Sequence, residues 1–354
     1  MCQAGKAGVI FERNSRALGA SIRNFGLVWP VGQQAGEHYA RAMASRRIWK
    51  ELADATGLEC NETGSLHLAY EKDELAVLEE FVQKTPGNGY SCELLTPHQV
   101  SARSNAVKTA GLLGAMYSPT EMTVNPREAC ARIAAWLEEQ LQVTMCFNTP
   151  VNGISMPFVE TSEGFWKAGK VFLCSGADFE TLYPQAFATA SLTKCKLQMM
   201  RTVPQPGKWQ LGPALCAGLT LLHYAAFNTC SSLAALRQRI AHEMPQHLQW
   251  GVHVLVSQNG AGELTIGDSH EYGSDFVPFD REFVNELILQ YMHRFLQAPD
   301  FTIQERWHGI YPKLTNGHAH LLLHPEKDVT IINGLGGAGM TLSFGLAEEI
   351  AANH

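Results

Sequence analysis

The feature that most constrains the fold is a strand, a glycine-rich loop and a helix at the end of the chain. Val329–Asn333 reads as a buried strand, residues 334–339 include four glycines, and a helix is predicted from about Met340 to Ala352. Glycines let a ligand approach the backbone closely, and the first N–H groups of a helix are free to bind a phosphate or the edge of a flavin ring. A tight structural turn is the alternative interpretation of this loop.

Composition excludes several classes of protein. A hydrophobic fraction of 45% with 17% charged residues is typical of a folded globular chain and not of a disordered one. The net charge of −7 argues against a dedicated nucleic-acid binder. No apolar run approaches the roughly 20 residues of a membrane-spanning helix. The 354 residues therefore correspond to about two domains of a protein with neither membrane nor nucleic-acid partners.

The expected location is the cytoplasm. The first residues contain no apolar core of a signal peptide. The nine cysteines are scattered and form no C-x-x-C pair, so we expect them to be reduced and mostly buried.

Periodicity predicts strands and helices that alternate at both ends of the chain. A short strand is expected at Gly8–Phe11 and another at 171–174. The predicted helices cover Glu37–Ala55, Asp73–Gln83, Pro126–Leu141 and Asp280–Leu296. Between them, polar and apolar residues alternate at 194–199 and in parts of 251–268, which is typical of a half-exposed antiparallel sheet.

Two further segments carry candidate ligand-binding groups. Glu12 follows the first strand, where an acidic residue can accept hydrogen bonds from ribose hydroxyls. The loop 19–26 contains Arg23 and Asn24, which could bind a pyrophosphate. A solvated carboxylate and a solvent-facing loop are the alternatives.

Taken together, these segments resemble the D-amino-acid oxidase family, which includes glycine and sarcosine oxidases and uses FAD. The resemblance covers essentially the whole chain. It implies an α/β (α+β) fold with a Rossmann-like FAD-binding domain (1–60, 123–190 and 312–354) interleaved with an antiparallel-sheet substrate domain (61–122 and 191–311).

The resemblance also implies residues that contact FAD. Glu12 and Arg13 match the ribose-binding strand end, and Ser21, Arg23 and Asn24 match the loop beneath the flavin. Val151 matches the adenine-binding backbone, and Gly176 and Ala177 match the second dinucleotide contact. The loop at the flavin's pyrimidine edge corresponds to Gly336, Gly337, Ala338, Gly339, Met340 and Thr341.

The motifs SIRNFG, CKLQMMR and GDSHEYG are similar to a bacterial branch associated with aminophosphonate breakdown. This resemblance implies oxidation of a small amine, such as 2-aminoethylphosphonate or its N-methyl form, by hydride transfer to flavin. The imine would hydrolyse to an aldehyde, and oxygen would reoxidise the flavin to give peroxide. A flavin dehydrogenase that uses another acceptor, and an inactive remnant that does not hold FAD, are the alternatives.

The substrate side departs from the family pattern. The segment 307–312 matches the family's W-x-G-x-R-P, but Tyr311 stands where the family has an arginine that binds a substrate carboxylate. A neutral phenol cannot replace a guanidinium, which favours an amine with a different anionic group. Arg201, His270 and Tyr311 are the candidate catalytic residues. The alternatives are a strand-end arginine that reaches solvent and a loop histidine with a structural role.

The beginning of the chain departs further. The family places G-x-G-x-x-G about 20 residues before its acidic residue, whereas only eleven residues precede Glu12. We therefore expect the first strand, the phosphate loop and most of the first helix to be missing.

No metal site is expected. His318, His320 and His324 follow the turn signal Asn316-Gly317, which favours a hairpin with exposed imidazoles over a metal centre. No G-x-S-x-G hydrolase motif is present.

Overall fold

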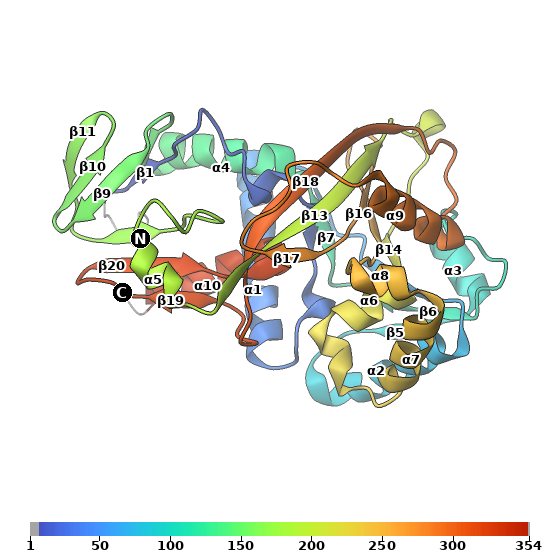
Figure 1. The fold of residues 1–354 in the computed structure, drawn as a ribbon. Coiled ribbons are helices and arrows are strands. Elements are labelled where there is room, and N and C mark those ends of the chain that lie inside the picture. Colours follow the sequence, from blue (N-terminus) through green and yellow to red (C-terminus); the bar gives the residue numbers. More distant parts are fainter. Residues whose placement is uncertain (1–6, 353–354) are drawn as a thin grey trace.

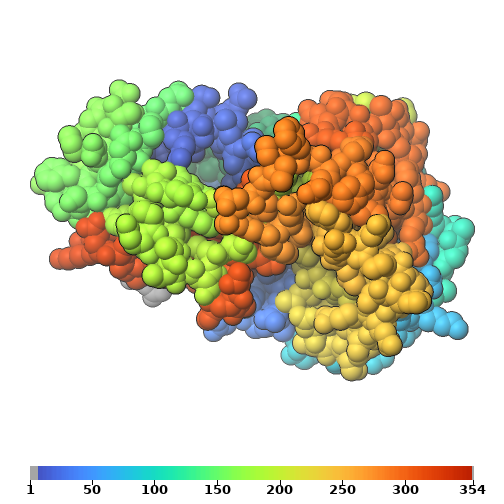
Figure 2. Space-filling view, in the orientation of Figure 1, coloured from blue at the N-terminus to red at the C-terminus, as the bar shows by residue number. Residues whose placement is uncertain are grey.

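The computed structural model describes residues 7–352, which form two lobes connected by long strands (Figure 1). The left lobe contains small sheets and both ends of the described chain. The right lobe contains much of a nine-stranded sheet and its covering helices. Figure 2 shows the yellow and orange part of the chain on the right and much of the blue and green part on the left. The predicted α/β (α+β) fold with parallel and antiparallel sheets is confirmed.

The nine-stranded sheet is predominantly antiparallel. Its strands are β4 (Ser65–Ala69), β5 (Glu93–Leu95), β6 (Gly114–Ser118), β13 (Leu192–Thr202), β14 (Ala214–Ala217), β15 (Leu255–Gln258), β16 (Leu264–Gly267), β17 (Glu271–Gly273) and β18 (Ile303–Leu314). Their order is β17-β13-β16-β15-β14-β4-β6-β5, and β18 pairs with β13 over its whole length. The pair β14 and β4 runs parallel.

The pairing of β13 with β18 fixes one face of the sheet toward the left lobe. Cys195 lies opposite Tyr311, and Met199 lies opposite Trp307. Side chains two residues apart on a strand share a face, so Cys195, Leu197 and Met199 of β13 lie on the same face as Trp307 and Tyr311 of β18. They form a small apolar cluster against Ala20 and Phe25 from the N-terminal segment.

The other face of β13 is not solvent-exposed, and the expectation of a half-exposed sheet is wrong for this strand. Lys196 and Gln198 are both buried. Lys196 Nζ donates to the carbonyls of Val277 and Phe279, and the Gln198 amide donates to Asn285 Oδ1. The polar half of the alternation is thus satisfied by the chain that covers it and not by water.

Helices cover the right part of the sheet. They are α2 (Lys72–Asn88), α3 (Pro97–Arg103), α6 (Gly218–His223), α7 (Leu233–Glu243), α8 (Pro245–Gln249) and α9 (Glu282–Phe295). Their apolar sides and the sheet form the main core, in which Leu66, Phe81, Phe227 and Ile288 are at most 2% exposed. Burial of such side chains stabilises the fold by about 1.5–3 kcal/mol each.

Two separate parallel pairs occupy the left lobe. β1 (Val9–Phe11) pairs with β8 (Thr144–Cys146), and β12 (Val171–Leu173) pairs with β20 (Val329–Asn333), which also pairs with β19 (Leu321–Leu323). Among the described strands, β1 and β12 each have a partner on one side only. Just beyond the two strands, Arg13 forms an ion pair with Asp178.

The remaining elements complete the left lobe and the middle of the molecule. They are β2 (Leu27–Val28), β3 (Cys60–Asn61), β7 (Met122–Val124), β9 (Val151–Ser155), β10 (Phe158–Thr161), β11 (Gly164–Lys167), α1 (Glu37–Thr56), α4 (Pro126–Leu141), α5 (Pro184–Ala188) and α10 (Gly339–Ala352). Helices α1 and α10 pack closely, and the Gly345 N–H donates to Ser45 Oγ at 2.8 Å. No helix within 7–352 has the length and hydropathy needed to cross a bilayer.

Two further expectations are wrong. The Asn316-Gly317 turn does not join a hairpin, because β18 pairs with β13 and β19 pairs with β20. The cysteines are not mostly buried either. Of those described, Cys195, Cys216 and Cys230 are buried, four are partly buried and Cys174 is exposed, while Cys2 lies outside the described residues. A thiol is small enough to sit at partly exposed positions at little cost.

Candidate functional site

The loop after β20 is held in place from several directions. Gly336 has a positive φ of 61°, which glycine adopts readily. The Trp29 N–H donates to Thr341 Oγ1 at 2.9 Å, and the Trp49 indole donates to the Met340 carbonyl at 2.7 Å. The loop therefore presents Gly337, Ala338 and Gly339 at the start of α10 in a fixed position.

A row of rings lies beside this loop. A Cβ added to Gly337 would lie 3.3 Å from the Tyr311 hydroxyl, so the glycine permits this close approach. The Tyr311 ring is 6.5 Å from that of His270, and His270 is 6.2 Å from Tyr272. The structure thus brings two of the three predicted catalytic residues, His270 and Tyr311, together next to the predicted flavin loop.

Sequence reasoning missed one cation in this cluster. Lys313 lies two residues after Tyr311 on β18, so both side chains leave the same face. Lys313 Nζ donates to the Tyr272 hydroxyl at 2.9 Å and lies 4.7 Å from the centre of that ring. The position directly after Tyr311-Pro312 could have drawn attention to this lysine.

The other members of the cluster are uncharged near neutral pH. Burial raises the pKa of the Tyr311 hydroxyl well above its usual range and lowers the pKa of the His270 imidazole. Burial also raises the pKa of Tyr272. The cluster therefore combines the positive charge of Lys313 with neutral rings, which is an environment for an anionic group.

Three more polar residues extend the cluster away from the loop. His253 Nε2 lies 3.1 Å from Asp268 Oδ1, and His270 Nε2 lies 3.9 Å from Asp268 Oδ2. The His223 ring stacks on that of His253 at 3.8 Å. The sequence alone could not show that these residues lie together, because His253 meets Asp268 only through backbone hydrogen bonds between distant segments.

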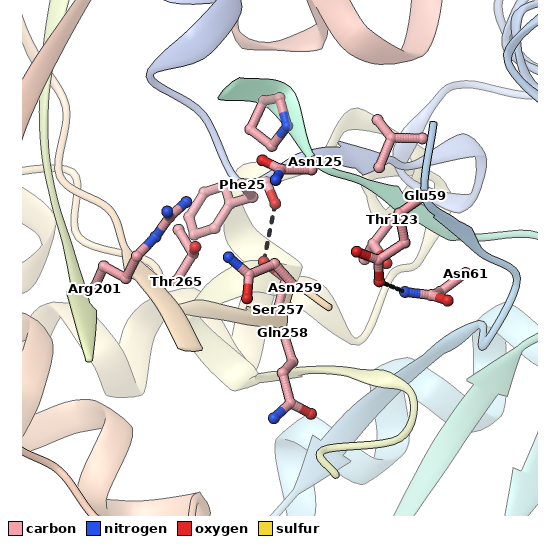
Figure 3. A pocket seen from close by; sticks show the side chains of 12 residues that line it. Phe25, Glu59, Asn61, Thr123, Asn125, Arg201, Ser257, Gln258, Asn259 and Thr265 are labelled. Atoms are coloured by element: carbon pink, nitrogen blue, oxygen red, sulfur yellow. Dashed lines mark hydrogen bonds between the residues drawn. The ribbon is translucent and has the colours of Figure 1, made fainter. Parts of the chain in front are cut away.

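Arg201 lies apart from this cluster. Six residues of β13 separate it from Cys195, the partner of Tyr311, which corresponds to about 20 Å along the strand. Its guanidinium is paired with Glu263 at 3.1 Å. The hollow that Arg201 lines with Phe25 and Thr265 (Figure 3) holds about 10 Å³, the space of one water molecule. These contacts favour a structural ion pair over a substrate contact.

The carboxylate predicted to bind ribose lies at the end of a parallel strand. Glu12 follows β1, and its Oε1 accepts hydrogen bonds from the Asn14 backbone N–H at 2.8 Å and side chain at 3.0 Å. Its second oxygen, Oε2, has no hydrogen-bond partner in residues 7–352. Arg13 is engaged with Asp178. Glu12 thus keeps a free acceptor at the end of a parallel strand, as a ribose hydroxyl requires.

The predicted loop beneath the flavin is held by its own hydrogen bonds. Ser21 belongs to a single short turn, 20–22. Asn24 donates to the carbonyls of Ala20 and Ser21 and accepts from the Gly26 N–H at 2.7 Å. Arg23 donates to the His308 carbonyl at 3.2 Å. In this arrangement the two side chains shape the loop and attach it to β18.

The remaining predicted contacts lie at other strand ends. Val151 begins β9, the first strand of an antiparallel three-stranded sheet. Gly176 and Ala177 follow β12, and the Gly176 carbonyl accepts from Asn333. Next to them, the buried Ser175 hydroxyl has no hydrogen-bond partner within the described chain.

These positions test whether the chain fits the predicted cofactor. Unpartnered buried polar groups are rare in folded proteins and point to a missing partner. The Ser175 hydroxyl, next to Gly176 and Ala177, is such a group. Together with the acceptor on Glu12 and the open space beside Gly339, it is compatible with a bound FAD. No glycine-rich phosphate loop lies between β1 and β12 in the described residues.

The C-terminal histidines do not form a site. His318 is exposed, His320 Nδ1 lies 3.2 Å from Arg41 Nη1, and His324 Nδ1 lies 3.2 Å from the Thr330 hydroxyl. The group of possible metal ligands within the described residues is instead His223, His253 and His270.

One family model covers nearly the whole chain. Residues 2–353 match the family model DAO, described as FAD dependent oxidoreductase. Human mitochondrial sarcosine dehydrogenase is 23% identical over 189 residues, which are 50% of this chain and 20% of that protein. The chain thus spans about a fifth of the length of this curated relative.

Solved structures share the fold. Glycine oxidase from Geobacillus kaustophilus superposes with a TM-score of 0.76 at 20% identity, covering 99% of this chain and 90% of that one. L-proline dehydrogenase from P. horikoshii gives a TM-score of 0.77 at 18% identity, covering 99% and 87%. Both alignments include nearly every residue of the chain described above.

Proposed function

The chain belongs to the DAO family of FAD-dependent oxidoreductases, and on this premise we propose that it oxidises a small amine that carries an anionic group. The substrate we propose is 2-aminoethylphosphonate or its N-methyl form. The observation that carries this proposal is Lys313, which lies with Tyr272 and Tyr311 beside the glycine loop.

The residues that would hold FAD lie at two ends of the left lobe. Glu12 would accept hydrogen bonds from the ribose, and the loop from Gly336 to Thr341 would hold the flavin. When bound, FAD accepts the hydride equivalent from the carbon next to the amine. The chain's own residues then have to bind the substrate, orient that C–H bond and keep water out.

Lys313 would bind the anionic group, because a charge-assisted hydrogen bond to phosphonate is stronger than a neutral one. His270 would orient the substrate beside the glycine loop. Its Nδ1 lies 2.9 Å from the Gly251 carbonyl, which assigns the ring proton to Nδ1 and fixes the ring. The substrate ammonium would lose its proton to solvent before C–H oxidation, and Tyr311 would cover the site as a neutral ring.

Water would hydrolyse the resulting imine to an aldehyde and release the amine, and oxygen would take the two electrons to give hydrogen peroxide. The likeness to human sarcosine dehydrogenase favours a second candidate, in which another electron acceptor replaces oxygen. Peroxide formation in air, compared with reduction of an added dye, separates the two.

The free cysteine side chains support a cytoplasmic location.

The test begins with the visible spectrum of the purified chain before and after addition of FAD. A protein that stays colourless after FAD is added would contradict the proposal for this chain. With flavin bound, we expect turnover of N-methyl-2-aminoethylphosphonate and little turnover of glycine or sarcosine. The opposite preference would exclude the aminophosphonate.

Lys313→Met tests the anion site. Loss of a charged hydrogen bond worth about 1.5–3 kcal/mol raises KM for the phosphonate about 10- to 150-fold. KM for ethylamine, which has no anionic group, should stay unchanged. Lys327→Met, at an exposed lysine outside the cluster, is the matched control.

A further inference from the structure

We propose that His223, His253 and His270, together with Asp268, bind one divalent first-row transition-metal ion such as Zn²⁺. One nitrogen of each histidine can be chosen so that all three lie within 4.8 Å of one another. Asp268 adds a carboxylate 3.1 Å from His253 and 3.9 Å from His270. Three imidazoles and one carboxylate are a donor set typical of tetrahedral zinc.

The strongest observation is that the buried groups of this cluster lack partners. His253 is 2% exposed, and neither of its ring nitrogens has a hydrogen bond within the described chain. Asp268 Oδ1 is also buried and without one, although it lies close to His253 Nε2. Leaving such groups unpaired costs about 1–3 kcal/mol each. A cation bound between them would satisfy the nitrogen and the oxygen together.

The backbone already fixes two of the ligands. The His253 N–H donates to the Asp268 carbonyl at 3.2 Å, and the Asp268 N–H donates to the His253 carbonyl at 2.8 Å. This reciprocal pair holds the two residues opposite each other on adjoining segments. These two hydrogen bonds lie just beyond the paired strands β15 and β16 and fix the separation of the two ligands.

The third ligand is oriented from behind. His270 Nδ1 lies 2.9 Å from the Gly251 carbonyl, so Nε2 is the atom that faces the cluster. A ligand histidine in a metal site commonly makes such a hydrogen bond with its other nitrogen, which fixes the tautomer and the ring.

His223 is the adjustable ligand. It ends α6 and is exposed, whereas His253 and His270 are buried. Ligand atoms around a tetrahedral zinc lie roughly 3.3 Å apart, as bonds of 2.0–2.2 Å require. Closing the cluster from 4.8 Å therefore needs a side chain to turn, and for the exposed His223 this means leaving its stacking contact with His253 at 3.8 Å. Its exposure also gives an ion a path from solvent.

The test is metal binding to the full chain, which requires neither flavin nor substrate. The protein is stripped with a chelator, dialysed and titrated with Zn²⁺ by calorimetry, and Co²⁺ is added to a second sample as a spectroscopic probe. We expect one ion per chain and the absorption of tetrahedral Co²⁺. Because no turnover is measured, failure of this proposal is distinguishable from failure of the proposed oxidation.

Variants separate a metal site from a structural cluster. His253→Asn and His223→Asn should each weaken Zn²⁺ binding at least 10-fold, while His318→Asn, at an exposed histidine outside the cluster, should not. His253→Cys keeps a ligand, so it should retain Zn²⁺ and add a thiolate band to the Co²⁺ spectrum. Absence of stoichiometric binding, or equal binding by wild type and the folded His253→Asn variant, would overturn the proposal.

Discussion

Tyr311 and Lys313 illustrate how one strand can change the chemistry of a site within two residues. In the resemblance described above, a guanidinium stands at the position of Tyr311. Here the ring at that position is buried and neutral, and the positive charge lies one step further along the same face of β18. A substrate anion would therefore sit nearer the Gly336 end of the loop, where Lys313 also contacts the backbone.

A second residue, His67, couples stability to pH. It lies in β4, is 1% exposed, and packs against Trp29 and Phe227 with no hydrogen bond to the described residues. Burial lowers the pKa of its imidazole to about 3. The folded protein keeps this ring neutral, while the unfolded chain takes up a proton below about pH 6.5. Stability is therefore lost as the pH falls from 6.5 toward 3.

We predict that His67→Phe removes this loss. Between pH 7 and pH 5, His67 should account for about 2 kcal/mol of the decrease in the free energy of unfolding. Urea denaturation of wild type and variant at both pH values measures the difference. The exposed His318→Gln should behave like wild type, and a His67→Phe protein with an unchanged pH dependence would contradict the assignment.

Local motifs mark two parts of the candidate site, and their contacts with FAD stay predictions. The loop at 336–341 and Glu12 each follow a strand in the structure, as the sequence pattern indicates. Arg201 is a candidate catalytic residue from the sequence, but in the structure it pairs with Glu263 from a distant segment. His253 likewise meets Asp268 only through pairing of segments, which no local pattern contains.

At the scale of elements, helices α1 and α10 approach each other so closely that their packing depends on a single glycine. A Cβ on Gly345 would lie 2.3 Å from the Arg41 carbonyl oxygen, which belongs to the backbone of α1. The two helices can approach only because this residue has no side chain. We predict that Gly345→Leu separates them and destabilises the protein by at least about 1–3 kcal/mol.

Thermal or urea denaturation measures this effect. Ala347→Leu places the same side chain at an exposed position of the same helix and should change stability by less than about 0.5 kcal/mol. If Gly345→Leu and Ala347→Leu had the same free energy of unfolding, α10 would be able to move away from α1 without loss of stability.

Element boundaries show what a local pattern can and cannot predict. α4 runs over Pro126–Leu141 as predicted, because Asn125 caps it and Pro126 fits its first turn. α2 was expected to end at Gln83 but continues to Asn88 through Pro86. The proline removes the N–H that would bond to the Val82 carbonyl, and the Thr85 hydroxyl donates to that carbonyl instead, at 2.8 Å. The Thr85 hydroxyl thus replaces the missing N–H as the donor, and a local sequence pattern does not reveal this hydrogen bond.

At the scale of the whole molecule, the two lobes differ in how completely their strands are paired. β13 is paired along both edges, whereas β1 and β12 are each paired along one edge among the described strands. We predict that amide hydrogens of β1 and β12 exchange about 100-fold faster, or more, than those of β13. Hydrogen exchange read by mass spectrometry or NMR measures this contrast.

Binding of FAD to the left lobe should slow exchange there and leave β13 unchanged, because ligand binding stabilises the state that it binds. Equal protection of β1 and β13 without FAD would contradict the pairing described here. The interleaving of two domains along the chain stays a prediction. The separation of the left lobe into two parallel pairs could not be predicted, because local periodicity does not contain strand partners.

The edge of β1 that has no partner among the described strands also bears on how the protein behaves in solution. An open edge offers a row of backbone N–H and C=O groups to any strand that can reach it, and natural proteins usually shield such edges with charge, proline or a covering helix. β1 consists of Val9, Ile10 and Phe11 and carries none of these protections within itself. Molecules that meet along this edge can extend each other's sheets, so light scattering at rising concentration should reveal growing aggregates. Solubility, more than melting temperature, would then set the practical limit on handling this chain.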